Sequence, residues 1–199
     1  ELLEAIRNRE TTLRIEKIFL SECNDKQEKR KAIEKTGHEA GCRILYLYGG
    51  DRIKSGELEL RYLYPYENTE GDGNEASQAL LLSLGDFRAL FTGDMEGAGE
   101  TAVTEALEQK QIEAQVLKVA HHGSKNSTSL RFLEALKPAA GIISCGEDNR
   151  YGHPHRELTE RLLQEKVKIF QTKELGAVFL VTDGKRSEVS FQHKKSMVN

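Results

Sequence analysis

Residues 114–124 read AQVLKVAHHGS, an apolar run that leads directly into two histidines, a glycine and a serine. The run at 114–120 has the length and composition of a buried β-strand, so His121 and His122 are expected at its carboxyl end. Ligands of open α/β sheets bind outside the carboxyl ends of the strands. Two adjacent histidines cannot both face one site from an extended chain. We therefore expect one to face the site and the other to pack beside it or to bind a carboxylate or carbonyl group.

Two further polar stretches follow predicted strands. Thr92-Gly93-Asp94 ends a strand at 87–92, and Asp94 is either a ligand of a metal or water, or the N-cap of the next helix. The stretch 151–155, YGHPH, follows a strand at 140–145 and is either part of a site or a helix-start loop with incidental histidines. The alternative is that His121 and His122 are ordinary loop residues, hydrogen-bonded within the protein and without a role in a site. Four of the six histidines lie in these two histidine-bearing loops, which favours a shared site over chance.

The remaining pattern predicts a mixed α/β fold. The segments 57–64, 77–84 and 87–92 read as antiparallel strands, and Gly85-Asp86 predicts a two-residue hairpin turn. The second half alternates strand and helix, which predicts a mixed sheet with helices packed outside it. We expect helices at 1–10, 24–40, 98–110, 128–136 and 154–165, and further strands at 13–20, 43–48, 167–171, 177–182 and 188–192. Ser127 or Thr128 is expected to cap the fourth helix, and Pro154 to begin the fifth.

Length and composition limit the class of protein. The chain has 199 residues, which predicts one domain, over 1–193, with a disordered tail at 194–199. A net charge of -3 excludes a basic nucleic-acid coat, and no apolar run reaches the roughly 18 residues of a membrane span. Three scattered cysteines form neither a disulfide framework nor a CxxC zinc signature. The chain opens at Glu1 with a charged helical pattern and has no signal peptide, so we expect a piece of a longer protein or a processed chain.

One carboxylate and several histidines at neighbouring strand ends suit a zinc or manganese site that activates water. Gly123 and Ser124 offer backbone N–H groups and a hydroxyl to a phosphate oxygen. His155 is expected in the first turn of a helix, where a neutral imidazole is favoured. Anion-binding and stacking groups lie nearby: Lys118, Lys125, Asn149, Arg150, Tyr151 and Arg156. Phosphodiesters, thioesters and lactams all remain open as substrates.

Four segments together resemble one family. They are LLLSLGDFRALFTGD (80–94), VLKVAHHGSKNSTS (116–129), FLEALKPAAGIIS (132–144) and NRYGHPH (149–155). In order and spacing they resemble the C-terminal metallo-β-lactamase-like domain of the ComEC competence proteins. The chain contains no GxSxG, HExxH, P-loop or GxGxxG motif that would favour another class.

The resemblance implies a metallo-β-lactamase-like αββα sandwich in which Asp94, His121 and His153 hold Zn²⁺ or Mn²⁺. It implies that Asp94, His121, His122 and Ser124 are catalytic, and that Ser124, Lys125, Asn149, Arg150, Tyr151 and His155 bind the substrate. It further implies a nuclease acting on DNA during uptake, as a soluble domain of a bacterial inner-membrane protein. The expected partners are DNA, as a single strand or a duplex end, the membrane channel of the parent chain and a second copy joined through exposed sheet.

The sequence departs from the family at its first metal motif. No HxDxDH-like string is present, and the only histidine before His121 is His38, in a helical pattern. We therefore expect a sandwich incomplete at its N-terminus, with little or no activity by itself. Three hypotheses stay open: a hydrolase of DNA phosphodiesters, a non-catalytic binding module of the same fold, and a metallohydrolase of a small-molecule ester, lactone or thioester.

Overall fold

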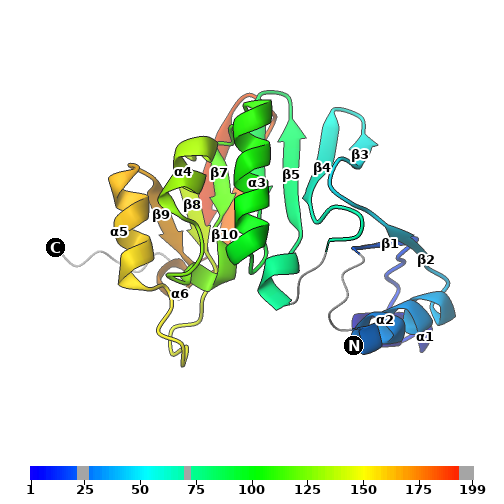
Figure 1. The fold of residues 1–199 in the computed structure, drawn as a ribbon. Helices are drawn as coiled ribbons and strands as arrows, with labels where there is room; N and C mark the ends of the chain where they lie inside the picture. The colour runs from blue at the N-terminus through cyan, green and yellow to red at the C-terminus, as the bar shows by residue number, and fades with distance from the viewer. Residues whose placement is uncertain (22–26, 70–72, 193–199) are drawn as a thin grey trace.

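The computed structural model describes residues 1–21, 27–69 and 73–192. Its centre is a seven-stranded sheet in the order β3-β4-β5-β6-β7-β8-β9 (Figure 1). Neighbours from β3 to β6 pair antiparallel, and neighbours from β6 to β9 pair parallel. The sequence predicted this mixed sheet but not β3. The strands are β3 (Arg52–Ser55), β4 (Leu58–Tyr64), β5 (Ala79–Leu84), β6 (Phe87–Phe91), β7 (Val116–Lys118), β8 (Ala140–Ile143) and β9 (Lys168–Gln171).

Three helices cover one face of this sheet, namely α3 (Gly97–Lys110), α4 (Leu130–Leu136) and α5 (Arg156–Gln164). Leu81, Leu90 and Leu117 lie side by side in the pairing register and point towards the helices. Val103 and Leu107 of α3 belong to the same buried core. This side of the sheet is therefore the main hydrophobic core of the molecule.

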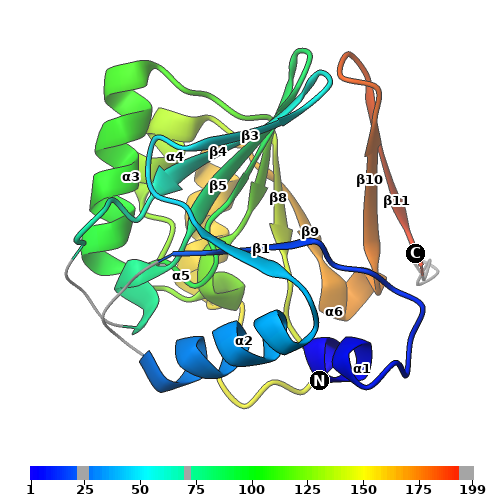
Figure 2. The same ribbon diagram turned by 90° about the vertical axis from the view of Figure 1, so that its right-hand side faces the viewer.

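A hairpin lies against the opposite face (Figure 2). It consists of β10 (Val178–Thr182) and β11 (Ser187–Phe191), paired antiparallel. Leu180 packs against a smaller buried cluster of Phe87, Ala89 and Val116. The two faces of the sheet are thus covered to different extents, by three helices on one side and by part of a hairpin on the other.

The N-terminal elements form a small layer beside the sheet: α1 (Leu2–Arg7), β1 (Lys17–Leu20), α2 (Gln27–Glu39) and β2 (Arg43–Tyr46). β1 and β2 pair parallel, and Gly37 of α2 sits directly over Ile18 and Ile44. The expected strands at 13–20 and 43–48 are shorter than predicted. The expected start of α2 at residues 24–26 and the expected tail at 194–199 lie outside the described residues.

Two predicted helix starts were wrong. α4 is capped by Ser129, whose Oγ accepts from the Phe132 N–H, because Thr128 has a positive φ of 57° and cannot begin a helix. α5 begins at Arg156, because His155 is extended and takes the N-cap position. Both errors arise in the two loops that join the candidate site, where contacts between loops decide the backbone.

Three elements carried no usable sequence signal. β3 is short and charged, and its pairing with β4 forms it. The 3-10 helix η2 (Ala120–Gly123) contains the His pair, and α6 (Thr172–Leu175) follows β9 directly. Another short 3-10 helix, η1 (Gly73–Ala76), precedes β5.

Candidate functional site

The ends of β6, β7 and β8 lie together because hydrogen bonds continue past the strands. The Thr92 hydroxyl donates to the Lys118 carbonyl over 3.0 Å, and the His121 N–H donates to the Gly93 carbonyl over 3.1 Å. The Val119 N–H donates to the Ile142 carbonyl over 2.9 Å. The loop carrying Asp94 and the loop carrying the two histidines are therefore fixed against each other.

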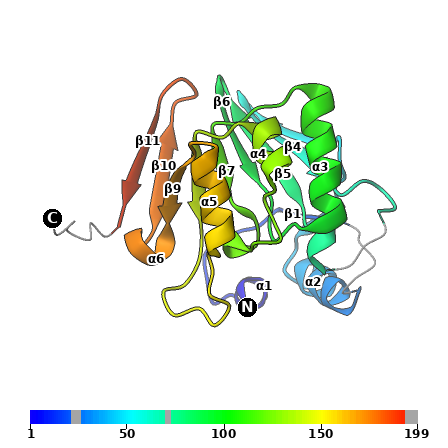
Figure 3. The same cartoon turned by 60° about the vertical axis from the view of Figure 1, so that its left-hand side comes forward.

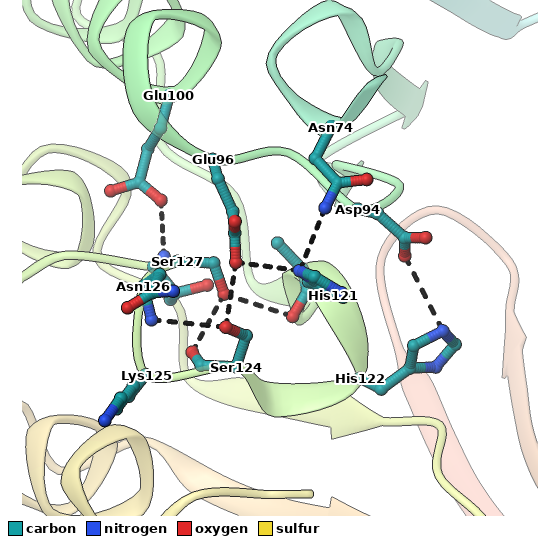
Figure 4. A network of polar contacts seen from close by, with 12 residues as sticks. Asn74, Asp94, Glu96, Glu100, His121, His122, Ser124, Lys125, Asn126 and Ser127 are labelled. Carbon is teal, nitrogen blue, oxygen red and sulfur yellow. Dashed lines mark hydrogen bonds and ion pairs between the residues drawn. The ribbon is translucent and has the colours of Figure 1, made fainter. Parts of the chain in front are cut away.

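His122 is the histidine that approaches Asp94. Its Nδ1 lies 2.7 Å from the Ser144 carbonyl oxygen, which can only accept, so Nδ1 carries the proton. The Nε2 lone pair then faces Asp94 Oδ1 at 3.7 Å (Figure 4). Two acceptor atoms at that separation do not bind each other, but they suit one shared cation. Both side chains are about half exposed, so a cation from solvent can reach them.

His121 is held by a different carboxylate. Its Nδ1 lies 2.7 Å from Glu96 Oε1, and the amide nitrogen of Asn74 is 3.3 Å from the same Nδ1. The Ser124 hydroxyl donates to the same Glu96 oxygen over 2.8 Å (Figure 4). Glu96 thus fixes the His121 ring and leaves Nε2 as its free nitrogen, an arrangement typical of imidazoles that serve a site.

The third loop brings two more imidazoles to the same place. The His153 ring lies with its centroid 5.5 Å from His121, 6.3 Å from His122 and 4.7 Å from His155. His153 is buried, and its main chain is held by Asn149, which accepts from the His153 N–H over 2.7 Å and donates to its carbonyl over 2.8 Å. Burial, and then the charge that His155, His121 and His122 can carry, lowers the pKa of His153. His153 is therefore a neutral imidazole near neutral pH.

Gly123 makes the contact between these loops possible. Its φ of 92° is left-handed, and a Cβ there would lie 2.5 Å from the Pro154 Cβ. The His155 N–H donates to the Gly123 carbonyl over 2.9 Å, and the Lys125 N–H donates to His155 Nδ1 over 3.0 Å. His155 consequently joins the second loop to the third.

Several residues expected to bind a substrate are engaged within the protein. The Ser124 N–H donates to the His121 carbonyl, and the Ser124 hydroxyl bonds Glu96 and accepts from the Asn126 N–H. The amide of Asn149 bonds Gly146 and His153. In contrast, Lys125, Arg150 and Tyr151 have exposed side chains. Anion or base contacts from these loops would therefore come from those three side chains.

Sequence reasoning missed the residues that hold the second loop. Glu100 of α3, nearly buried, accepts from the Thr128 and Ser129 N–H groups. Arg161 of α5 donates to the carbonyls of Lys125, Ser127 and Thr128 at 2.8–3.2 Å. In the sequence both are ordinary charged helix residues, and nothing in their spacing indicates these bonds.

The described residues form only part of a metal site. Within the described part of the chain, no group of three or more His, Cys, Asp and Glu side chains is arranged to hold a metal ion. Catalytic zinc takes three protein ligands. Asp94 and His122 therefore fit two positions of a site, and the described residues do not fit a whole one.

The architecture is that of the metallo-β-lactamase fold, as the sequence resemblance implied. The solved structure titled CmlA beta-hydroxylase E377D mutant matches 78% of this chain and 38% of its own, with a TM-score of 0.51 and 9% identity, a likeness of fold alone. The metallo-beta-lactamase fold protein YhfI from Bacillus subtilis matches 87% of this chain and 65% of its own, with a TM-score of 0.49 and 8% identity. No family model matches the chain.

The chain is homologous to competence proteins over part of their length. It is 33% identical to ComE operon protein 3 of Bacillus subtilis over 164 residues, 82% of this chain and 20% of that protein. It is 33% identical to Competence protein ComA of Neisseria gonorrhoeae over 124 residues, 61% of this chain and 17% of that protein. The chain thus spans about a fifth of the length of these curated relatives. None of the helices in the described part of the chain has the length and apolarity to cross a membrane.

Proposed function

We propose that this chain is part of a metal-dependent phosphodiesterase that cuts DNA during competence-related DNA uptake. The observation that carries the proposal is the Asp94–His122 pair, with two acceptor atoms 3.7 Å apart at the carboxyl edge of the sheet. Homology to competence proteins supports DNA as the substrate. The membrane channel of a longer protein and a second copy of the chain are the further partners in this proposal.

Asp94 and His122 would hold one side of a Zn²⁺ or Mn²⁺, and groups outside the described residues would complete its coordination. The ion would supply a water that is nucleophilic near neutral pH. The carbonyl of Ser144 keeps the proton on His122 Nδ1, so that Nε2 remains a ligand. The resemblance also implied that His121 and His153 bind the metal, and this remains a prediction.

The charged side chains around the loops support a phosphodiester over a neutral ester. Lys125 and Arg150 are exposed on the loops that surround the imidazoles, and Arg156, which pairs with Glu160, is exposed at the start of α5, so that all three can meet a DNA backbone. A small-molecule ester or thioester would need an enclosed pocket for its remaining atoms. The exposed cations suit a long anionic polymer better.

A second candidate function is a DNA-binding module without catalysis. The observation that favours it is that the described residues supply no third metal ligand. In that case the exposed cations would retain DNA, and the Asp94–His122 pair would bind a cation weakly or not at all.

Metal binding and DNA cleavage test the proposal together. Equilibrium dialysis with Zn²⁺ and Mn²⁺ is expected to show binding that weakens at least about tenfold in Asp94→Ala and in His122→Ala. Asp86→Ala, an exposed aspartate in the β5–β6 turn, is the matched control and should bind as the parent does. Any Mn²⁺-dependent cleavage of single-stranded DNA should be lost in Asp94→Ala and in His122→Ala, and kept in Asp86→Ala.

Unchanged metal binding or full cleavage in Asp94→Ala would contradict the assignment. DNA binding without cleavage at saturating metal would favour the non-catalytic module. Cleavage of a thioester or lactone but not of DNA would show that the site acts on small-molecule substrates instead of DNA.

A further inference from the structure

The loop between β8 and α5 projects from the molecule (Figure 3). It lies beside the candidate site, because its His153 ring is near those of His121 and His122. Its residues 149–153 carry Arg150 and Tyr151, whose side chains are exposed, before the chain turns back to the buried His153. Tyr151 is 61% exposed, although an aromatic ring of that size is usually covered. An exposed aromatic ring held in a fixed place near a polar site is a candidate contact for a ligand.

Three rings of this region form a stack that begins at the Asp94–His122 pair. The planes of His122 and His153 differ by 18°, with centroids 6.3 Å apart. The planes of His153 and Tyr151 differ by 24°, with centroids 5.8 Å apart. The nearly parallel rings therefore continue from the candidate metal ligand outwards to the exposed Tyr151.

Arg150 fixes the outer end of the stack. Its guanidinium donates to the Tyr151 hydroxyl over 2.6 Å, and its Cζ lies 4.8 Å from the centre of the Tyr151 ring. Asn149 holds the base of the loop through its bonds to Gly146 and His153. The Tyr151 ring thus has a fixed orientation and a cation over it, and a guanidinium plane can itself stack on a base.

We propose that Tyr151 and Arg150 form a ledge on which an unpaired base of single-stranded DNA stacks, next to the Asp94–His122 pair. The proposal rests on the proposed function and specifies its substrate as a single strand. A base inside a duplex cannot stack on an aromatic ring in this way, because both of its faces are covered by the neighbouring base pairs. Lys125, exposed on the adjoining loop, would contact the phosphates of the strand.

Stacking predicts a dependence on bases that phosphate binding does not. Base–aromatic stacking contributes enough that loss of the ring weakens single-strand binding about five- to a hundredfold. It requires the ring and not its hydroxyl. A ledge that bound only phosphate would treat normal and abasic strands alike.

The test compares a fluorescein-labelled oligothymidylate with an abasic oligonucleotide of the same length and charge, by anisotropy at one fixed salt concentration. The unaltered protein should bind the normal strand at least about fivefold more tightly. Tyr151→Ala should remove this difference by weakening binding of the normal strand alone. Tyr151→Phe should retain it. Phe179→Ala, which removes an exposed ring of β10, is the control and should change neither affinity.

Equal affinities of the unaltered protein for the two strands would overturn the ledge while leaving DNA binding intact. Equal weakening of both strands in Tyr151→Ala would also overturn it, and thermal unfolding of each variant separates such a loss from misfolding. A protein that binds neither strand would overturn both the ledge and the proposed DNA substrate. The comparison of the two strands with the unaltered protein needs no variant, so the proposal remains testable even if Tyr151→Ala fails to fold.

Discussion

Two charged helix residues near the candidate site, the buried Glu100 and the partly buried Arg161, hold backbone groups in place. The Glu100 carboxylate accepts hydrogen bonds from the N–H groups of Thr128 and Ser129, and the Arg161 guanidinium donates to three carbonyls of the same loop. The loop between the His pair and α4 is therefore fixed from two helices that are distant in sequence. Buried backbone groups of an irregular loop require such partners, because water cannot supply them.

Glu100→Gln is expected to destabilise the protein by about 1–3 kcal/mol, since the new amide presents an N–H group to one of two backbone donors. Urea unfolding of the variant measures the change in the free energy of unfolding. Glu105→Gln, an exposed position on the same helix, is the control and should change it by less than about 0.5 kcal/mol. Equal stability of the two variants would contradict the role of Glu100.

Lys118 is a residue whose position costs stability. It lies on the side of the sheet that faces the β10–β11 hairpin, the same side as Val116. Burial lowers the pKa of Lys118 from the ordinary value of 10.5, while the charges of Asp94 and Cys145 raise it. Between the folded pKa and 10.5 the unfolded chain binds more protons, so stability rises with pH in that window. Below the folded pKa the cost of burying the ammonium group is fully present.

Lys118→Met is therefore expected to raise the free energy of unfolding at neutral pH and to remove the alkaline rise. Chemical unfolding at a series of pH values from neutral to about 10.5 tests both effects. The control is Lys35→Met on α2, an exposed position, which should change neither. If the free energy of unfolding depends on pH in the same way in the unaltered protein and in Lys118→Met, the expectation is wrong.

At the scale of elements, the hairpin β10–β11 docks through its turn. The Gly184 carbonyl accepts from the N–H groups of Asp86 and Phe87 in the β5–β6 turn, at 2.8 and 3.1 Å. A Cβ on Gly85 would lie 2.9 Å from that carbonyl oxygen. The glycine that the sequence marked as a hairpin turn thus has a second role, since it lets another turn approach closely.

Gly85→Ala should destabilise the protein by about 1 kcal/mol more than Gly56→Ala. The two glycines have nearly the same φ, 55° and 59°, so both variants bear the strain of a left-handed alanine. Only position 85 meets a neighbour, because nothing lies within 4 Å of a Cβ at Gly56. Thermal unfolding measures the difference in stability between the two variants. Amide hydrogen exchange in β10 and β11 should be faster in Gly85→Ala than in Gly56→Ala. Equal losses would mean that the turn contact contributes nothing.

At the scale of the whole molecule, the two faces of the central sheet differ. The helix side forms one continuous buried core. On the other side the hairpin buries a smaller cluster and leaves Phe91 of β6 42% exposed on the same face. Phe179 and Val181 of β10 are exposed on the outer surface of the hairpin, because Leu180 between them packs inwards. Exposed apolar side chains around an incompletely covered sheet face are typical of a surface that another protein segment covers.

The chain is accordingly expected to self-associate as its concentration rises, and Phe91→Gln should weaken that association. Sedimentation velocity over a concentration series measures it. Leu163→Gln changes an equally apolar, 64% exposed residue on the helix side and should leave association unchanged. A chain that stays monomeric throughout, or one that both variants affect alike, would contradict a role for this face.

The site could be foreseen only in outline. Sequence alone located Asp94, the His pair and the HPH loop at neighbouring strand ends, because parallel strands bring their carboxyl ends to one edge. It could not decide which histidine faces Asp94. Both residues have left-handed backbones, with φ of 44° and 55°, which follow from the bonds of the loop to Glu96 and from the Gly123–Pro154 contact.

Hydrophobic periodicity and turn residues by themselves determined the mixed sheet, its antiparallel and parallel halves and the helices on it, because these patterns act over a few residues. The starts of α4 and α5, the pairing of β3 and the use of Ser124 and Asn149 within the loops were decided by the tertiary structure. These features depend on hydrogen bonds between segments far apart in the chain. Such bonds leave no periodic trace in the sequence, since a single glutamate or arginine at the right place is sufficient.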